Sequence, residues 1–198
     1  MPFAVVLDAC VLVPLGLCDS LLRLAETGLY RPLWSDEILE EVRRTLANKL
    51  GLGDDRARRR VDAMRRAFPD ALVENHESLI AAMTNDPKDR HVLAAAVRAD
   101  AALLVTANVK DFPPASVDPY DIDVVHPDDF LLDQLELDHS GVLTCLREQR
   151  AAYRDPAMDV HQFYEMLSGT VPLFARAARS IEQQRHSADV EELGRREP

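Results

Sequence analysis

The chain of 198 residues has room for one domain of ordinary size plus an extension. Its composition, 47% hydrophobic and 29% charged with only 7 glycines, is typical of a globular protein and argues against wholesale disorder. No apolar run approaches the ~20 residues of a membrane span. The formal net charge of −11 argues against a protein that coats nucleic acid through its overall positive field.

The cysteines indicate the cellular compartment. Cys10, Cys18 and Cys145 are odd in number and show no C-x-x-C spacing, so neither a disulfide framework nor a zinc site is predicted. The first residues lack the basic patch and the cleavage site of a secretory signal. We therefore expect a cytoplasmic protein with no membrane association.

The first part of the chain alternates apolar runs with helical patterns. The run "VVLDACVLVP" is short and β-branched, which predicts a buried strand over residues 3–8. Helices are predicted over 19–27 and 35–49, the second with Ser35 as its N-cap and acids in its first turn. The basic run "DDRARRRVDAMRRAF" predicts a further helix, and "ALVE" (71–74) a short strand.

The next segments continue this alternation. "NDPKDRHVLAAAVRADA" predicts a helix with Asp86 as N-cap and Pro87 at its first position. Strands are predicted over 102–108 and 121–125. Alternating strands and helices indicate an α/β fold with a parallel sheet covered on both sides.

Strand signals end at about residue 133, and three helical patterns follow. We expect an α/β domain over residues 1–132 and a helical C-terminal extension over 133–198.

Four acids fall where such a fold binds ligands, beyond the carboxyl ends of its strands. Asp8 and Asp111 follow strand ends, Asp89 begins a helix that feeds a strand, and Glu41 borders a buried helical stripe. If these acids meet, their repulsion is severe unless a divalent cation lies among them. Oxygen ligands of this kind suit Mg²⁺ or Mn²⁺.

The order of four motifs carries a family resemblance. "VVLDACVLVP", "SDEILEEV", "DPKDRHVLAAAV" and "LLVTANVKDFP" together resemble the PIN-domain nucleases, in particular the VapC toxins of bacterial toxin–antitoxin pairs. The likeness covers residues 1–132, and the helical remainder is similar to extensions found in a longer subgroup. It implies a three-layer PIN-like fold in which helices flank a central parallel sheet.

The resemblance also implies an activity and a set of site residues. Similar proteins are metal-dependent endoribonucleases that cut structured RNA such as tRNA or rRNA, are usually dimeric, and are held inactive by a small antitoxin. One or two Mg²⁺ or Mn²⁺ ions assist the hydrolysis of the phosphodiester. Positions that match the family's acids and metal ligands are Asp8, Glu41, Asp89 and Asp111. Thr106 and Asn108 match polar residues that orient these acids through hydrogen bonds.

Two positions depart from the family pattern. Cys10 stands where Asn or Ser is common, which weakens a hydrogen bond to the site, and Asn108 stands where Asp is frequent. The second departure leaves open whether one metal or two are held.

The basic helix is the candidate for RNA binding. Its arginines, among them Arg56, Arg59 and Arg60, give a local positive surplus against the overall charge. The same pattern also suits a solvated face that pairs with acids elsewhere.

Alternatives remain beside the nuclease. Each acid alone has a plainer role: a strand-end acceptor, a helix-dipole partner, a solvated helix acid or a turn residue. A phosphatase of the haloacid-dehalogenase type needs a second Asp where Cys10 stands, which argues against that reading. A PIN-like module that binds RNA or protein without cutting stays open, as does a main role for the C-terminal helices in holding a basic antitoxin segment.

Overall fold

The computed structural model describes residues 2–194, and it describes side chains up to residue 184. The chain divides into two compact units between Pro127 and Asp128. This division lies five residues before the boundary expected from the sequence, since the helix that starts at Pro127 packs with the C-terminal helices. The assignment of a nuclease domain to residues 1–132 stays a prediction.

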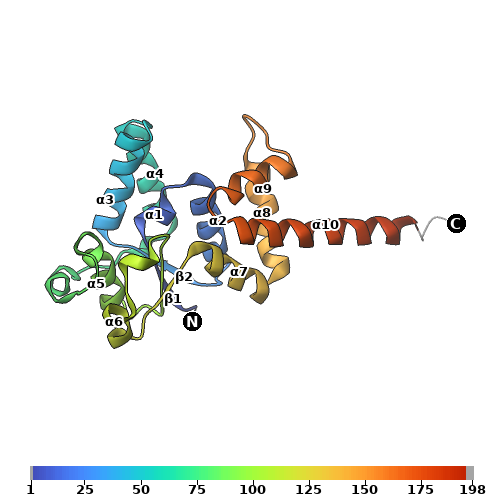
Figure 1. Ribbon diagram of the computed structural model, residues 1–198. Helices are drawn as coiled ribbons and strands as arrows, with labels where there is room; N and C mark the ends of the chain where they lie inside the picture. The colour runs from blue at the N-terminus through green and yellow to red at the C-terminus, as the bar shows by residue number, and fades with distance from the viewer. Residues whose placement is uncertain (1, 195–198) are drawn as a thin grey trace. The chain divides into compact units, whose positions relative to one another are not determined.

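The first unit is built on a four-stranded parallel sheet in the order β2-β1-β3-β4 (Figure 1). The strands are β1 (Ala4–Leu7), β2 (Arg31–Leu33), β3 (Leu103–Val105) and β4 (Asp123–Val125). In β1, Val5, Val6 and Leu7 are fully buried, as expected for a parallel strand with both faces covered. The predicted α/β class with a parallel sheet is confirmed.

Helices surround this sheet. They are α1 (Ala9–Leu12), α2 (Leu15–Glu26), α3 (Asp36–Arg44), α4 (Asp54–Ala67), α5 (Arg90–Arg98) and α6 (Pro114–Val117), with a π-helical turn over Thr45–Lys49 between α3 and α4. Short 3-10 turns cover Pro69–Ala71, Glu77–Ala82, Pro87–Asp89, Val109–Asp111 and Asp118–Tyr120. The predicted cap of α3 is present, since the Ser35 hydroxyl accepts a hydrogen bond from the backbone N–H of Ile38.

Two predicted elements differ from the structure. The strand expected over 71–74 is wrong: a 3-10 turn ends at Ala71, and only a single bridge joins Leu72 to Trp34. Conversely, β2 was not predicted, because a three-residue run with Pro32 at its centre has no strand pattern. Proline is tolerated there because β2 is an edge strand.

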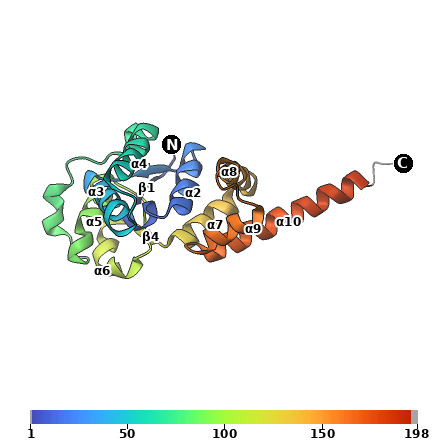
Figure 2. The same cartoon turned by 90° about the horizontal axis from the view of Figure 1, so that it is seen from above.

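The second unit consists of helices. These are α7 (Pro127–Leu137), α8 (His139–Ala152), α9 (Val160–Ser168) and α10 (Pro172–Gly194), and α9 lies along the first turns of α10 (Figure 2). Asp159 and Gln162 form a reciprocal capping box at the start of α9. Among the described residues, no helix is both long and apolar enough to span a bilayer.

The buried carboxylate of Asp128 joins the start of α7 to the start of α10. It accepts hydrogen bonds from the backbone N–H groups of Leu173, at 3.0 Å, and Phe174, at 2.8 Å, at the start of α10. We expect Asp128→Ala to lower the free energy of unfolding by about 1–3 kcal/mol, because two backbone donors, that of Phe174 buried and that of Leu173 partly buried, lose a charged acceptor. Thermal unfolding of the full chain measures this, with the exposed Asp129→Ala as control. Equal melting temperatures would contradict the assigned role.

Candidate active site

The sheet order places a crevice between β1 and β3. The chain leaves β1 for β2 on one side and later returns to β3 on the other, and a reversal of this kind is where open α/β sheets bind ligands. Asp8 directly follows β1 and Thr106 directly follows β3. Two predicted site residues therefore lie side by side at the carboxyl edge of the sheet.

Asp8 is almost completely buried and is oriented by two donors. The Thr106 hydroxyl donates to Asp8 Oδ2 at 2.7 Å, and the Cys10 thiol donates to the same oxygen at 3.1 Å. Burial, followed by the charge of Asp8, raises the pKa of the Cys10 thiol to about 12. The thiol therefore stays protonated and continues to donate, although more weakly than an amide or a hydroxyl would.

The Asp89 carboxylate is buried with few partners for its negative charge. It closes the 3-10 turn Pro87–Asp89, in which Asp86 Oδ1 accepts a hydrogen bond from the backbone N–H of Lys88; α5 then begins at Arg90, later than predicted. The side-chain atom Oδ2 of Asp89 is buried and has no hydrogen-bond partner among the described residues. Burial, followed by the charge of Asp8, raises the pKa of the Asp89 carboxyl to about 6.

Lys88 supplies the nearest positive charge. Its ammonium lies 2.9 Å from Asp111 Oδ2 and 3.8 Å from Asp89 Oδ2. The hydrogen bond from Lys88 holds the pKa of the Asp111 carboxyl below its usual range. Asp111 does not line the pocket that contains the other three predicted acids. The structure therefore brings Asp111 to the edge of the site, where its carboxylate forms an ion pair with the Lys88 ammonium.

Glu41 reaches the same site from α3. His91 Nε2 lies 3.8 Å from Glu41 Oε1. No spacing in the sequence marked His91 as a neighbour of the site. The adjacent Glu40 instead pairs with Arg43, at 2.6 Å, and contacts Arg44. Of two consecutive glutamates, only Glu41 lines the pocket.

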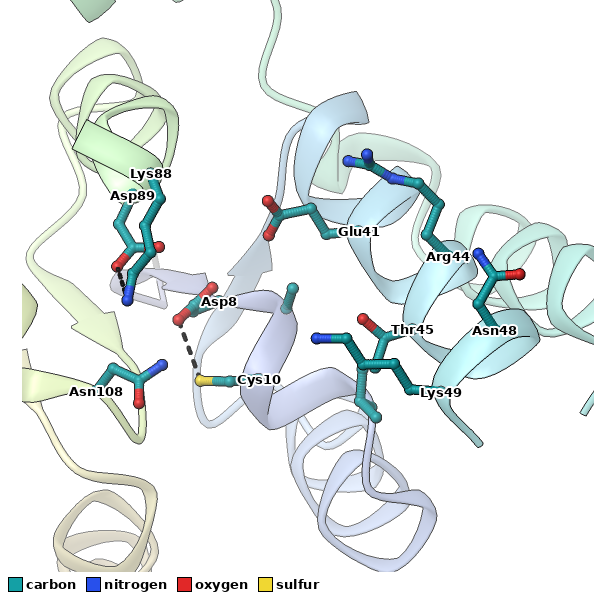
Figure 3. A pocket seen from close by; sticks show the side chains of 12 residues that line it. Asp8, Cys10, Glu41, Arg44, Thr45, Asn48, Lys49, Lys88, Asp89 and Asn108 are labelled. Carbon is teal, nitrogen blue, oxygen red and sulfur yellow. Dashed lines mark hydrogen bonds and ion pairs between the residues drawn. The ribbon is translucent and has the colours of Figure 1, made fainter. Parts of the chain in front are cut away.

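Three of the four predicted acids line one cavity of about 540 Å³, together with other polar side chains (Figure 3). Asp8, Cys10 and Asn108 lie along the edge of the sheet, Lys88 and Asp89 precede α5, and Glu41 lies on α3. The remaining polar lining comes from the end of α3 and its π-helical turn: Arg44, Thr45, Asn48 and Lys49. Sequence analysis missed these four, because it sought RNA-binding cations on the next helix.

The arginines predicted to bind RNA do not line this cavity. Arg60 donates to two backbone carbonyls, those of Leu12 at 2.7 Å and Val13 at 3.0 Å, so its guanidinium ties α4 to the end of α1. Arg56 and Arg59 are exposed on α4. An RNA contact by these arginines stays a prediction.

We expect Arg60→Gln to lower the free energy of unfolding by about 1–3 kcal/mol, because both carbonyls lose a charged donor. Arg59→Gln should change it by less than about 0.5 kcal/mol, as is usual for an exposed side chain. Urea unfolding of the two variants beside the wild type measures this difference. Similar unfolding midpoints for both variants would show that the Arg60 contacts contribute little.

The donor set fits a divalent cation in its chemistry. Asp8, Glu41 and Asp89 offer carboxylate oxygens, the ligands that Mg²⁺ and Mn²⁺ prefer. The buried Oδ2 of Asp89 accepts no hydrogen bond from a described residue and has only the Lys88 ammonium near it, at 3.8 Å. As the described side chains stand, no three His, Cys, Asp or Glu residues are close enough to hold a metal ion together. Binding one would therefore require these acids to draw closer or to hold the ion partly through its water molecules.

Comparison with known proteins gives three matches. Residues 4–110 match the family model described as PIN domain, and residues 127–180 match the one described as VapC50 C-terminal domain. Over 111 residues the chain is 46% identical to "Putative ribonuclease VapC50" of Mycobacterium tuberculosis (strain ATCC 25618 / H37Rv). That match spans 56% of this chain and 66% of the relative, slightly under two thirds of its length. No solved structure matches.

Proposed function

Because this chain belongs to the PIN-domain family, as the match over residues 4–110 establishes, we propose that it is a metal-dependent endoribonuclease and the toxin of a toxin–antitoxin pair. The predicted family resemblance is confirmed, including the helical C-terminal extension. One observation carries the proposal: Asp8, Glu41 and Asp89, from three separate elements, line a single pocket at the carboxyl edge of the sheet.

Asp8, Glu41 and Asp89 would hold the cation, and Asp111 would join them when Lys88 releases it. A bound Mg²⁺ or Mn²⁺ supplies Lewis-acid polarisation of the scissile phosphate and activation of the attacking water.

The other residues orient these acids and the RNA. Thr106 and Cys10 fix the carboxylate of Asp8 through their hydrogen bonds to Oδ2. The Thr106 hydroxyl also accepts a hydrogen bond from the backbone N–H of Asn108, at 3.1 Å, which holds the Asn108 amide at the pocket, where it can donate to a phosphate oxygen. Released from Asp111, the Lys88 ammonium can pair with the same phosphate.

The partners follow from the same proposal. The substrate is structured RNA such as tRNA or rRNA, the inhibitor is a small cognate antitoxin, and the active form is a homodimer. All three cysteines are free, which suits the reducing cytoplasm as the place of action. The helical unit would shape the choice of substrate or contact the antitoxin.

The experiment that tests the proposal is cleavage of end-labelled total tRNA and rRNA by the purified protein with Mn²⁺, with Mg²⁺ and with a chelator. The matched control is the double variant Asp8→Asn, Asp89→Asn, prepared in the same way. Discrete, metal-dependent cuts by the wild type alone support the nuclease. Equal cutting by both proteins points to a contaminant. RNA binding without cutting would favour the alternative of a catalytically silent PIN-like module.

A further inference from the structure

One wall of the acid pocket carries positive rather than negative charge. The end of α3 and the π-helical turn Thr45–Lys49 contribute Arg44, Asn48 and Lys49 to the lining, on the same helix as Glu41 (Figure 3). Figure 3 shows the Lys49 side chain extending into the pocket toward Cys10. The pocket therefore holds its acids and these three donor side chains in one space.

The π-helical turn explains how these side chains share a wall. Glu41, Arg44 and Asn48 follow one another at spacings of three and four residues, which places them on one helical face. Lys49 would lie off this face in a regular α-helix. The turn is closed instead by a hydrogen bond from the Leu50 N–H to the Thr45 carbonyl, at 3.1 Å, and this wider i to i+5 winding brings Lys49 back toward Glu41.

The two cations on this wall are free to bind a ligand. Lys49 is exposed and forms no ion pair with any described side chain. Among the described side chains, the exposed Arg44 has a single long ion contact, 3.7 Å from its Nε to Glu40 Oε1. Exposed pairs of this kind contribute little. On α4, Arg58 pairs with Asp54 and Arg65 with Asp36. The exposed Arg56 and Arg59 lie outside the lining of the acid pocket.

The negative net charge of the protein explains why positive side chains are needed at this pocket. The protein carries a net charge of −11, and three carboxylates line the pocket, so an RNA strand is repelled from the site before any cation binds. Guanidinium and ammonium groups facing the acids provide a local attraction for phosphate. A cavity of about 540 Å³ falls within the range of about 300–1,000 Å³ for small-ligand sites, large enough for a nucleotide unit.

We infer that Arg44, Asn48 and Lys49 form a phosphate-binding rim that seats the RNA phosphate next to the scissile one. This inference rests on the proposed function, whose acids receive the scissile phosphate itself. The two cations bind the backbone irrespective of base, while Asn48 donates its amide to a phosphate oxygen. The rim thus fixes the register of the strand in the pocket, which the arginines of α4 do not line.

The test compares the double variants Arg44→Gln, Lys49→Gln and Arg56→Gln, Arg59→Gln with the wild type, all in chelator so that no cleavage occurs. The probe is a short, labelled, single-stranded poly(U) RNA, titrated at several salt concentrations. Loss of the rim should weaken binding roughly tenfold and reduce the salt slope by about 1.4, since each phosphate contact to a single strand contributes about 0.7. The variant on α4 tests the other candidate RNA contact, and if the rim supplies the contact it should bind as the wild type does.

Calorimetric titration with Mn²⁺ tests whether the rim has a merely structural role. Loss of the rim should leave Mn²⁺ affinity unchanged or higher, because two positive charges beside the acids are removed, whereas a damaged fold would lower both affinities. Unchanged RNA binding, or an equal loss in the variant on α4, overturns the inference. A rim variant that binds RNA normally while the wild type cuts RNA refutes the rim alone. If the rim contributes to RNA binding but the wild-type protein cuts no RNA, the proposed nuclease activity is refuted and the rim is retained.

Discussion

Glu41→Gln is expected to reduce RNA cleavage by roughly a hundredfold or more, whereas Glu40→Gln should leave it within a factor of two or so of the wild type. Glu41 lines the acid pocket, so its substitution removes a negative charge that would hold the cation. Such charge stabilisation is worth several kcal/mol, and about 1.36 kcal/mol corresponds to a tenfold change in rate. Glu40 lies outside the pocket and pairs with Arg43.

The measurement is the initial rate of cleavage of an RNA substrate at saturating Mn²⁺, together with Mn²⁺ affinity by calorimetry. For Glu41→Gln we expect both the rate and the affinity to fall. The two glutamates are adjacent on one helix, so general damage to α3 would affect both variants alike. Equal rates for the two variants would exclude Glu41 from the set of metal-holding acids.

Asp89→Asn is expected to stabilise the metal-free protein at neutral pH while it abolishes cleavage. The pKa of Asp89 is raised to about 6, from an ordinary value of 3.8, by burial and by the charge of Asp8. At about 1.36 kcal/mol per pH unit, this difference sets an upper bound of roughly 3 kcal/mol on the penalty to the folded state once Asp89 is ionised, and solvent screening reduces it. The gain on substitution is up to this amount, less the loss from burying an amide.

The pH dependence fixes the sign of this prediction. Below about pH 4, Asp89 is protonated in both the folded and the unfolded chain, so its charge contributes nothing. Between about pH 4 and pH 6 the unfolded chain releases the proton first, and the wild type loses stability as pH rises. Above pH 6 the full penalty is present. The advantage of Asp89→Asn should therefore appear over this window.

Urea unfolding of both proteins in chelator, at several pH values, measures the effect. Asp111→Asn is a control of opposite sign: Lys88 lowers the pKa of Asp111, so this substitution should destabilise the protein above about pH 4. Added Mn²⁺ should stabilise the wild type more than Asp89→Asn, because binding to the folded state adds to its stability. An Asp89→Asn protein that is less stable than the wild type at pH 7 would show that Asp89 has a satisfied structural role instead.

The acids were identifiable from sequence for local reasons. Asp8 is a lone acid in a short β-branched run, so its position at a strand end followed from the pattern alone. Ser35 and Asp86 marked the starts of two helical segments through their capping side chains. The type of element depends mainly on short-range periodicity and capping, and both are present in the linear order of residues.

The basic residues show where such reasoning stops. Arg60 lies in the most basic run of the chain, yet its guanidinium binds the carbonyls of Leu12 and Val13, far away in sequence. Lys49 was not predicted as a site residue, because the π-helical turn that directs it toward the acids has no sequence signature. In both cases the partners of a long, flexible side chain come from tertiary contacts.

The sequence by itself determined the α/β class, the helical C-terminal part, the family resemblance and the four candidate acids. Only the tertiary structure decided that β2 joins β1, that Asp111 is held at the edge of the site by Lys88, and that Arg44, Asn48 and Lys49 line the same pocket as the acids. Local propensity specifies each element over a few residues. The meeting of side chains from separate elements depends on strand order, helix winding and charge pairing across the folded chain.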